Sequence, residues 1–135
     1  MAEGDIDKLL MWEHTNVCSD GSASGRHPRG YGAFTRILKI YVREKNLLPI
    51  ELAVHKMTGL SADHLGLKRR GYIKQGFYAD LVLFDKSTVG DRSTTAEPQA
   101  TSEGILGVWV NGKPVYSVQG ATGNLPGRVI RRGDL

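Results

Sequence analysis

Residues 71–85 read GYIKQGFYADLVLFD and hold the strongest strand signal of the chain. Within them, residues 79–85 place an unbroken apolar run between acidic residues, which is typical of a buried strand. A hairpin is predicted further on, where residues 108–110 and 113–116 flank Asn111-Gly112, the pair preferred by a type I′ turn. Pro114 cannot donate a backbone hydrogen bond to a sheet, so we expect its strand to lie at an edge or to turn outward there.

Helical patterns dominate the sequence before these strands. The clearest covers residues 33–46, where one apolar stripe repeats at helical spacing through Phe34, Ile37, Leu38, Tyr41 and Val42. Weaker patterns predict helices over residues 5–12, over 49–59 with Gly59 at the end, and over 61–65 with Ser61 as the cap. A short strand is predicted at Val17-Cys18, and loops over residues 21–32 and 86–103.

The change from helix signals to strand signals falls near residue 68. We therefore expect an α+β protein with two parts, residues 1–67 and residues 68–135. Its 135 residues suffice for a respectable core, and no apolar run is long enough to span a membrane. The acidic start lacks the order of a secretory signal, and a single cysteine excludes an internal disulfide, which together predict a cytoplasmic protein.

The charge of the chain is uneven along its length. The net charge is +4, and residues 1–20 are acidic while the remainder is basic. The basic residues are scattered and are not interleaved with aromatic side chains in the manner of RNA-binding domains. We therefore expect a solvated basic surface rather than a nucleic-acid partner.

The residue that most suggests chemistry is Asp20, in Ser19-Asp20-Gly21. It follows the predicted Val17-Cys18 strand, and barrel enzymes place catalytic groups at such strand ends, although the same tripeptide often makes only a turn. Residues 27–29 read His-Pro-Arg. The guanidinium of Arg29 suits a two-pronged grip on a carboxylate, or is a solvated loop arginine. His27 positions the loop, contacts substrate or lies on the surface.

Together, the Ser-Asp-Gly, the His-Pro-Arg and the Gly-Ile-Gly-Ala-Asp-Leu-Val pattern of residues 71–82 resemble the C-terminal region of the D-aminoacylase family. These N-acyl-D-amino-acid deacylases belong to the amidohydrolase superfamily, and the resemblance covers roughly residues 5–132. It implies that residues 1–67 carry the last strand, the catalytic-Asp loop and helices of a metal-dependent (β/α)₈ barrel. Residues 68–135 would be the β-rich segment of a composite β-sandwich beside the barrel.

The resemblance also implies roles for the site residues. In a zinc-dependent hydrolysis of the amide C–N bond, Asp20 would take the proton from the attacking water and pass it to the leaving amine. Arg29 would hold the substrate carboxylate, with His27 as a second substrate-binding residue. The family's metal-ligating histidines and cysteine have no counterpart among His14, His27, His55, His64 and Cys18. We expect Cys18 to be a small buried residue instead.

These departures decide what we expect of the chain by itself. Catalytic zinc commonly takes three protein ligands, and Asp20 offers one metal-adjacent group, so we expect no bound zinc and no activity. The alternative is a non-catalytic assembly or binding module derived from such an enzyme. The barrel core and the sandwich core would each be half absent from this chain, so apolar residues would be exposed unless something else buries them. This predicts a homodimer or pairing with the missing N-terminal barrel portion. The apolar residues concerned are Tyr41, Val42, Leu81, Leu83 and Trp109.

Overall fold

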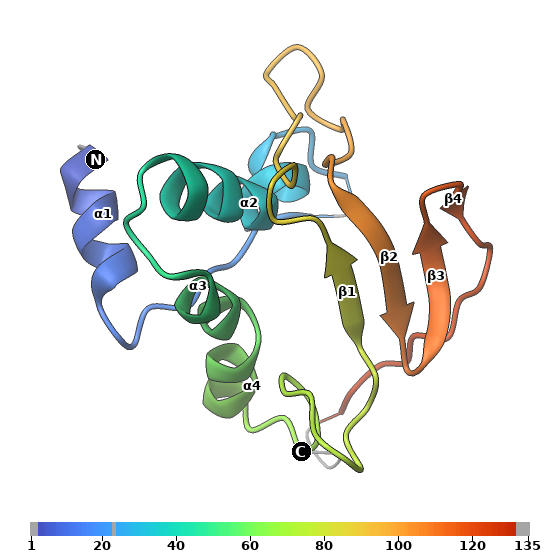
Figure 1. Ribbon diagram of the computed structural model, residues 1–135. Helices are drawn as coiled ribbons and strands as arrows, with labels where there is room; N and C mark the ends of the chain where they lie inside the picture. Colours follow the sequence, from blue (N-terminus) through green and yellow to red (C-terminus); the bar gives the residue numbers. More distant parts are fainter. Residues whose placement is uncertain (1–2, 23, 132–135) are drawn as a thin grey trace.

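The structure is a computed structural model that describes residues 3–22 and 24–131. Helices gather on one side of the molecule and a sheet forms the other, so the expected α+β class is confirmed (Figure 1). In chain order the elements are α1 (Glu3–Met11), α2 (Arg29–Arg36), the π-helix η1 (Ile37–Glu44), α3 (Ile50–Met57), α4 (Gly59–Leu65), β1 (Leu81–Phe84), β2 (Ile105–Val110), β3 (Lys113–Ser117) and β4 (Gly120–Ala121).

The helices confirm the sequence pattern in outline and correct it at the ends. The helix predicted over residues 33–46 begins earlier, at Arg29, and its second half is η1, in which the amide of Lys45 reaches back five residues to the carbonyl of Ile40 at 2.8 Å. Gly59 was expected to end α3, but it begins α4. A side chain there would clash with the ring of Tyr72, so Gly59 serves close packing.

Three smaller predictions about the first half are wrong. Val17 and Cys18 form no strand, because the amide of Val17 bonds to the carbonyl of Lys56 at 3.3 Å and no strand lies beside them in the described residues. Cys18 is consequently exposed rather than buried. Ser61 does not cap α4, since its hydroxyl donates to the carbonyl of Lys56 instead.

The sheet is antiparallel, with strand order β1-β2-β3-β4. The predicted hairpin is confirmed, with Val110 opposite Lys113 and positive φ at both Asn111 (48°) and Gly112 (78°). β4 was not predicted, and it pairs with β3 only at Tyr116 and Ser117. Pro114 has no β4 residue opposite it, but β3 is an inner strand of the sheet, and the carbonyl of Pro114 accepts from the hydroxyl of Thr122 and from Nδ2 of Asn124, both at 2.8 Å.

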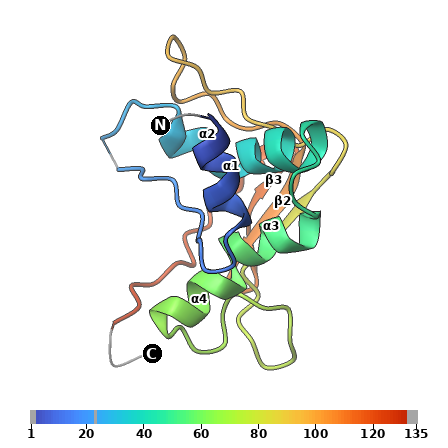
Figure 2. The same cartoon turned by 90° about the vertical axis from the view of Figure 1, so that its left-hand side faces the viewer.

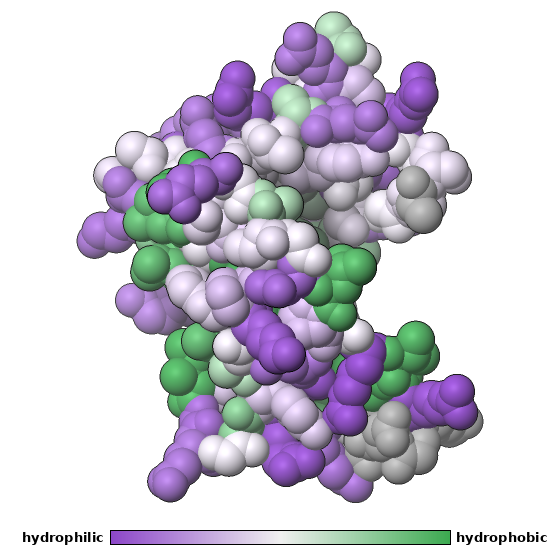
Figure 3. Space-filling view, turned by 90° about the vertical axis from the view of Figure 1, so that its right-hand side faces the viewer, coloured by the Kyte–Doolittle hydropathy of each residue, from purple (hydrophilic) through white to green (hydrophobic). Residues whose placement is uncertain are grey.

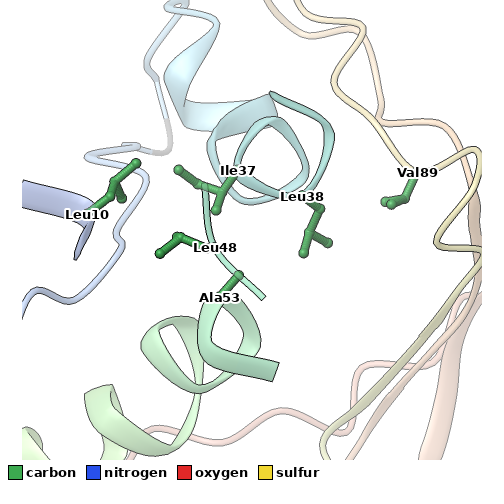
Figure 4. Packing of buried hydrophobic residues seen from close by; sticks show 6 residues of the cluster. All are labelled: Leu10, Ile37, Leu38, Leu48, Ala53 and Val89. Carbon is green, nitrogen blue, oxygen red and sulfur yellow. The ribbon is translucent and has the colours of Figure 1, made fainter. Parts of the chain in front are cut away.

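One hydrophobic cluster joins the two sides of the molecule. Its buried members come from α1, η1, the turn after η1, α3 and the loop after β1; they are Leu10, Ile37, Leu38, Leu48, Ala53 and Val89 (Figure 4). The view turned by 90° shows α1 standing in front of the other helices, with the sheet behind them (Figure 2). Because Val89 lies beyond residue 68, the helical part and the sheet part share this core.

The five apolar residues expected to face water behave differently from one another. Leu83 is 53% exposed, as predicted. Tyr41 and Val42 pack against the cluster, and Leu81 and Trp109 are half-buried in the sheet, so the chain covers these four itself. The face seen in Figure 3 is mostly hydrophilic; its outline is indented on the right at mid-height, and hydrophobic residues lie above and below this indentation. None of the described helices is long and apolar enough to cross a lipid bilayer.

Candidate functional site

The backbone at Asp20 is held in a left-handed conformation, with φ 49°. Aspartate is one of the few residues other than glycine that adopts it readily. Beyond it the loop folds back on itself, and a side-chain carbon added at Gly21 would lie 3.1 Å from the Cα of Gly30. Two facing glycines therefore let both ends of the loop approach each other, which brings Asp20 to the beginning of α2.

Asp20 meets Arg29 across this loop. An Nη2 of Arg29 lies 2.9 Å from Oδ2 of Asp20, and the backbone amide of Arg29 donates to Nδ1 of His27 at 3.2 Å. The three residues singled out in the sequence are thus brought together. The side chains of Asp20 and Arg29 are 71% and 56% exposed, so this ion pair contributes at most about 1 kcal/mol to stability. The ion pair therefore matters mainly because it holds the carboxylate of Asp20 beside Arg29.

A second contact holds the loop from the side of the sheet. The hydroxyl of Tyr31 donates to the carbonyl of Gly25 at 3.2 Å, and the amide nitrogen of Gln99 donates to the same hydroxyl at 2.9 Å. Gln99 belongs to the long loop between β1 and β2. The Asp20 loop is thereby fastened to a segment almost seventy residues further along the chain.

Asp20 lies at the rim of a hollow of about 510 Å³. The apolar part of its wall includes Val17, Phe34, Met57 and Leu65. A hydrogen-bonded chain crosses the polar part, in which Oδ1 of Asn16 lies 2.7 Å from Nδ1 of His64 and Nδ2 of Asn16 donates to the hydroxyl of Ser61 at 3.0 Å.

This chain of side chains explains Asn16, which is unexpectedly polar for a strand that would lie inside a barrel. Its amide ties the segment before Asp20 to α4, while His64 remains the exposed surface residue that its helical position predicts. Sequence reasoning did not foresee that these side chains would border the hollow.

Lys56 is a supporting residue that the sequence analysis missed. Its side chain is fully buried, and its Nζ donates to the carbonyls of Trp12 (2.5 Å) and Thr15 (3.3 Å), while its own carbonyl accepts from the amide of Val17. Burial lowers the pKa of this ammonium, against the smaller opposing effect of the Glu13 carboxylate. Lys56 thus holds the segment that leads to Asp20. Its position three residues after Ala53, on the apolar side of α3, is the signal that could have revealed it.

The described residues do not fit a complete metal site. Among residues 3–22 and 24–131, no three histidine, cysteine, aspartate or glutamate side chains gather closely enough to hold a metal ion. A catalytic zinc commonly takes three protein ligands, and Asp20 would be one of them at most.

Comparison with known proteins shows which family this chain belongs to. A family model described as the amidohydrolase family matches residues 9–116. The chain belongs to the amidohydrolase family. It is 43% identical to an N-acyl-D-aspartate deacylase and 44% identical to a D-aminoacylase, both from Alcaligenes xylosoxydans xylosoxydans. These matches cover 99% and 98% of the chain, which confirms the expected relation to the D-aminoacylase group.

Solved amidohydrolase structures agree in three dimensions. A D-aminoacylase mutant in complex with copper chloride is 44% identical and matches 98% of this chain with a TM-score of 0.92. An N-acyl-D-glutamate deacylase from Bordetella bronchiseptica, complexed with zinc and a phosphonate inhibitor, is 43% identical and matches 97% with a TM-score of 0.89. The chain spans only 27% to 28% of the length of these relatives.

Proposed function

We propose that this chain supplies the C-terminal corner of the active site of a zinc-dependent N-acyl-D-amino-acid deacylase. The observation that carries the proposal is the meeting of Asp20 and Arg29 at 2.9 Å on the rim of the hollow. It is supported by relatives named as deacylases of N-acyl-D-aspartate and N-acyl-D-glutamate. The substrate class is therefore a small N-acyl-D-amino acid.

Asp20 is proposed as the proton carrier. Hydrolysis forms a bond from the water oxygen to the acyl carbon and breaks the bond from that carbon to the amide nitrogen. The carboxylate accepts a proton from the attacking water and later gives it to the departing nitrogen, which leaves as an amine. Asp20 has a left-handed backbone, and its carboxylate lies against the guanidinium of Arg29 at the beginning of α2.

Arg29 is proposed to grip the substrate carboxylate. A guanidinium presents several N–H donors in one plane, so it can bind a carboxylate through two parallel hydrogen bonds. In the present arrangement one of these groups meets Asp20, and an arriving substrate carboxylate would compete for it. His27 acts in this proposal by holding the backbone of Arg29, and its exposed ring faces incoming substrate.

The rest of the active site belongs, in this proposal, to the part of the relatives that this chain does not span. Residues 1–67 would complete a barrel and residues 68–135 a sandwich, with the zinc ligands in the complementary portion. In this proposal the isolated chain binds no zinc and is inactive, because the zinc ligands come from that complementary portion.

Joining this chain to the remainder of the D-aminoacylase, in place of the matching segment, tests the proposal. The joined protein is expected to hydrolyse N-acetyl-D-amino acids, while the isolated chain releases no acetate. Arg29→Lys keeps the charge but loses the planar fork, so its KM should rise by about tenfold with a smaller change in kcat. Exposed Arg26, in the same loop, is the matched control, and Arg26→Lys should leave KM unchanged.

A joined protein that folds and binds zinc but hydrolyses none of these substrates would contradict the proposed function. Metal analysis of the isolated chain adds a second test. About one zinc per chain would overturn the division of ligands, because a site would then assemble without the complementary portion.

The second candidate function is a non-catalytic assembly module, most simply a homodimer. The open edge of β1 favours it, since within the described residues β1 pairs with β2 alone, and Leu83 on this strand is largely exposed. Sedimentation of the isolated chain distinguishes the candidates. A dimer that persists on dilution supports the module, and a monomer that binds the complementary portion supports the enzyme fragment.

A further inference from the structure

A second hollow is lined by residues 67–70 after α4, by Tyr78 and by residues 128 and 130 of the C-terminal segment, and it shares no lining residue with the hollow beside Asp20. Its volume is about 330 Å³, and four cationic residues line it together with Tyr78, Leu67 and Ile130. The cations are Lys68, Arg69, Arg70 and Arg128, which the sequence places at opposite ends of the second half. Folding thus brings Arg128 beside three cations that are consecutive in the sequence.

Three guanidinium groups surround one aromatic ring in this hollow. The Cζ atoms of Arg69, Arg70 and Arg128 lie 5.0, 4.2 and 5.0 Å from the centre of the Tyr78 ring. Cation–π attraction offsets some of the repulsion between like charges, but neutralises none of them. The cluster therefore creates a local positive potential.

The acidic residue of the cluster is already engaged. Asp80 pairs with Arg70, whose second amino group donates to Oδ1 of Asn111 at 2.9 Å. Within the part of the chain that the structure describes, no carboxylate lies within ion-pair distance of Lys68, Arg69 or Arg128. Among the described residues, three positive charges of the cluster therefore have no carboxylate as an ion-pair partner.

The hydroxyl of Tyr78 points to the kind of ligand. It accepts hydrogen bonds from Nη2 of Arg69 (3.1 Å) and from Nη2 of Arg128 (2.8 Å). A phenol that accepts two hydrogen bonds keeps its own O–H available as a donor. The hydroxyl and the two guanidinium groups therefore present several donors within one small space, and an oxyanion is the partner that can accept from all of them.

The backbone of Arg69 adds an independent observation. Its φ is 59°, a left-handed conformation that costs a residue with a side chain about 1–2 kcal/mol. The carbonyl of Arg69 accepts from the amide of Tyr78 at 2.9 Å, so this conformation fixes the arginine beside the phenol. Backbone strain of this kind is concentrated at active sites and at sites that hold ligands.

We propose that the cluster formed by Lys68, Arg69, Tyr78 and Arg128 binds a phosphate group, either inorganic phosphate or the phosphate of a small monoester. Each guanidinium donates to two phosphate oxygens, and the Tyr78 hydroxyl donates to a third. Arg70 stays paired with Asp80, and its guanidinium packs against the ring of Tyr78. This site is separate from the Asp20 loop and does not depend on the proposed deacylase chemistry.

Calorimetric titration of the whole chain with sodium phosphate at constant ionic strength tests the proposal. Saturable binding of one phosphate per chain is expected, with affinity at least about tenfold weaker in Arg69→Gln and Arg128→Gln, because each loses charged hydrogen bonds. Tyr78→Phe keeps the ring that the cations pack on and removes the donor, so it should weaken binding without unfolding the chain. Glycerol 3-phosphate, titrated in parallel, distinguishes a monoester from free phosphate.

Arg92→Gln is the matched control, since Arg92 is an exposed arginine of the loop between β1 and β2 and its loss changes the net charge equally. It should bind phosphate like the unchanged chain. Equal weakening in Arg92→Gln, or binding that disappears when chloride holds the ionic strength, would overturn the proposal. Retention of an oligonucleotide by a chain that ignores both phosphate probes would also overturn it, in favour of a nucleic-acid surface.

Discussion

Lys56→Met removes a charge from a position where the side chain has 0% exposure. The ammonium holds the carbonyls of Trp12 and Thr15 in the turn after α1. After the substitution, the carbonyl of Trp12 still accepts from the amide of Thr15 at 3.1 Å. The carbonyl of Thr15 has no other donor among the described contacts, so one half-buried acceptor loses its partner.

The change in the free energy of unfolding follows from two destabilising contributions and one that offsets them. A hydrogen-bond acceptor left without a partner costs about 1–3 kcal/mol. Methionine refills the space of the lysine stem, so the cavity contribution stays below about 1.5 kcal/mol. Removing a buried charge offsets part of this loss. We therefore expect Lys56→Met to lower the free energy of unfolding by about 1–2 kcal/mol at pH 7.

The pH dependence gives the same experiment a second outcome. Burial holds the pKa of folded Lys56 below the ordinary 10.5. Between that lowered pKa and 10.5 the unfolded state binds more protons than the folded state, so stability rises with pH. Methionine does not titrate. The stability difference between the unchanged chain and Lys56→Met should therefore grow through this window and stay constant below it.

Urea unfolding, followed by tryptophan fluorescence, measures both outcomes. Lys8 is the matched control, because it is an exposed lysine of α1 and Lys8→Met should change stability by less than about 0.5 kcal/mol. A Lys56→Met chain at least as stable as the unchanged chain at pH 7 would refute the reasoning, since desolvation would then outweigh the two hydrogen bonds. A difference that shrinks as pH rises would refute the assigned direction of the pKa shift.

Three further predictions concern the core, a glycine of the signature and an acidic turn. Leu48→Ala, at 1% exposure in the shared cluster, should cost about 2–5 kcal/mol in urea unfolding. Gly71→Ala should cost far more than Gly76→Ala, because both have positive φ but only at Gly71 would the new carbon meet Ala62, at 2.6 Å; equal losses would contradict this packing role. The hydroxyl and amide of Ser87 lower the pKa of Asp85 from 3.8, so its stabilisation is complete above pH 3.8 and is lost as pH falls further; Asp85→Asn should flatten that part of the acid-unfolding curve.

Local signals account for the parts of the fold that were predicted well. The Asn111-Gly112 turn depends on the backbone preferences of two residues, so the sequence is sufficient to identify it. The apolar stripe from Phe34 to Val42 likewise identified a helix. Such a stripe suits an α-helix and a π-helix alike, so the π-helical hydrogen bonding of η1 could not be predicted from it. β4 is two residues long and exists through its pairing with β3, which no local pattern records.

In the candidate site, too, residues in local motifs could be singled out from the sequence, and residues that act through distant contacts could not. Asp20, His27 and Arg29 were identified from motifs close together in the sequence, and the structure brings them into contact. The strand expected before Asp20 failed because a strand needs a neighbour, and residue composition alone cannot supply one. Lys56 lies 44 and 41 residues from the two carbonyls that it holds, so its role could be recognised only once the fold was known.

The measurement that tests the central claim most directly is kcat of the joined protein carrying Asp20→Asn. Asparagine fills the same space but cannot accept the proton of the attacking water. Proton transfer by a positioned group contributes about 10²–10⁴ in rate, and we predict a loss of that size with the zinc content unchanged. Glu97→Gln, at an exposed carboxylate of the β1–β2 loop, should leave kcat unaltered. A joined protein with Asp20→Asn that retains the full kcat would contradict the account.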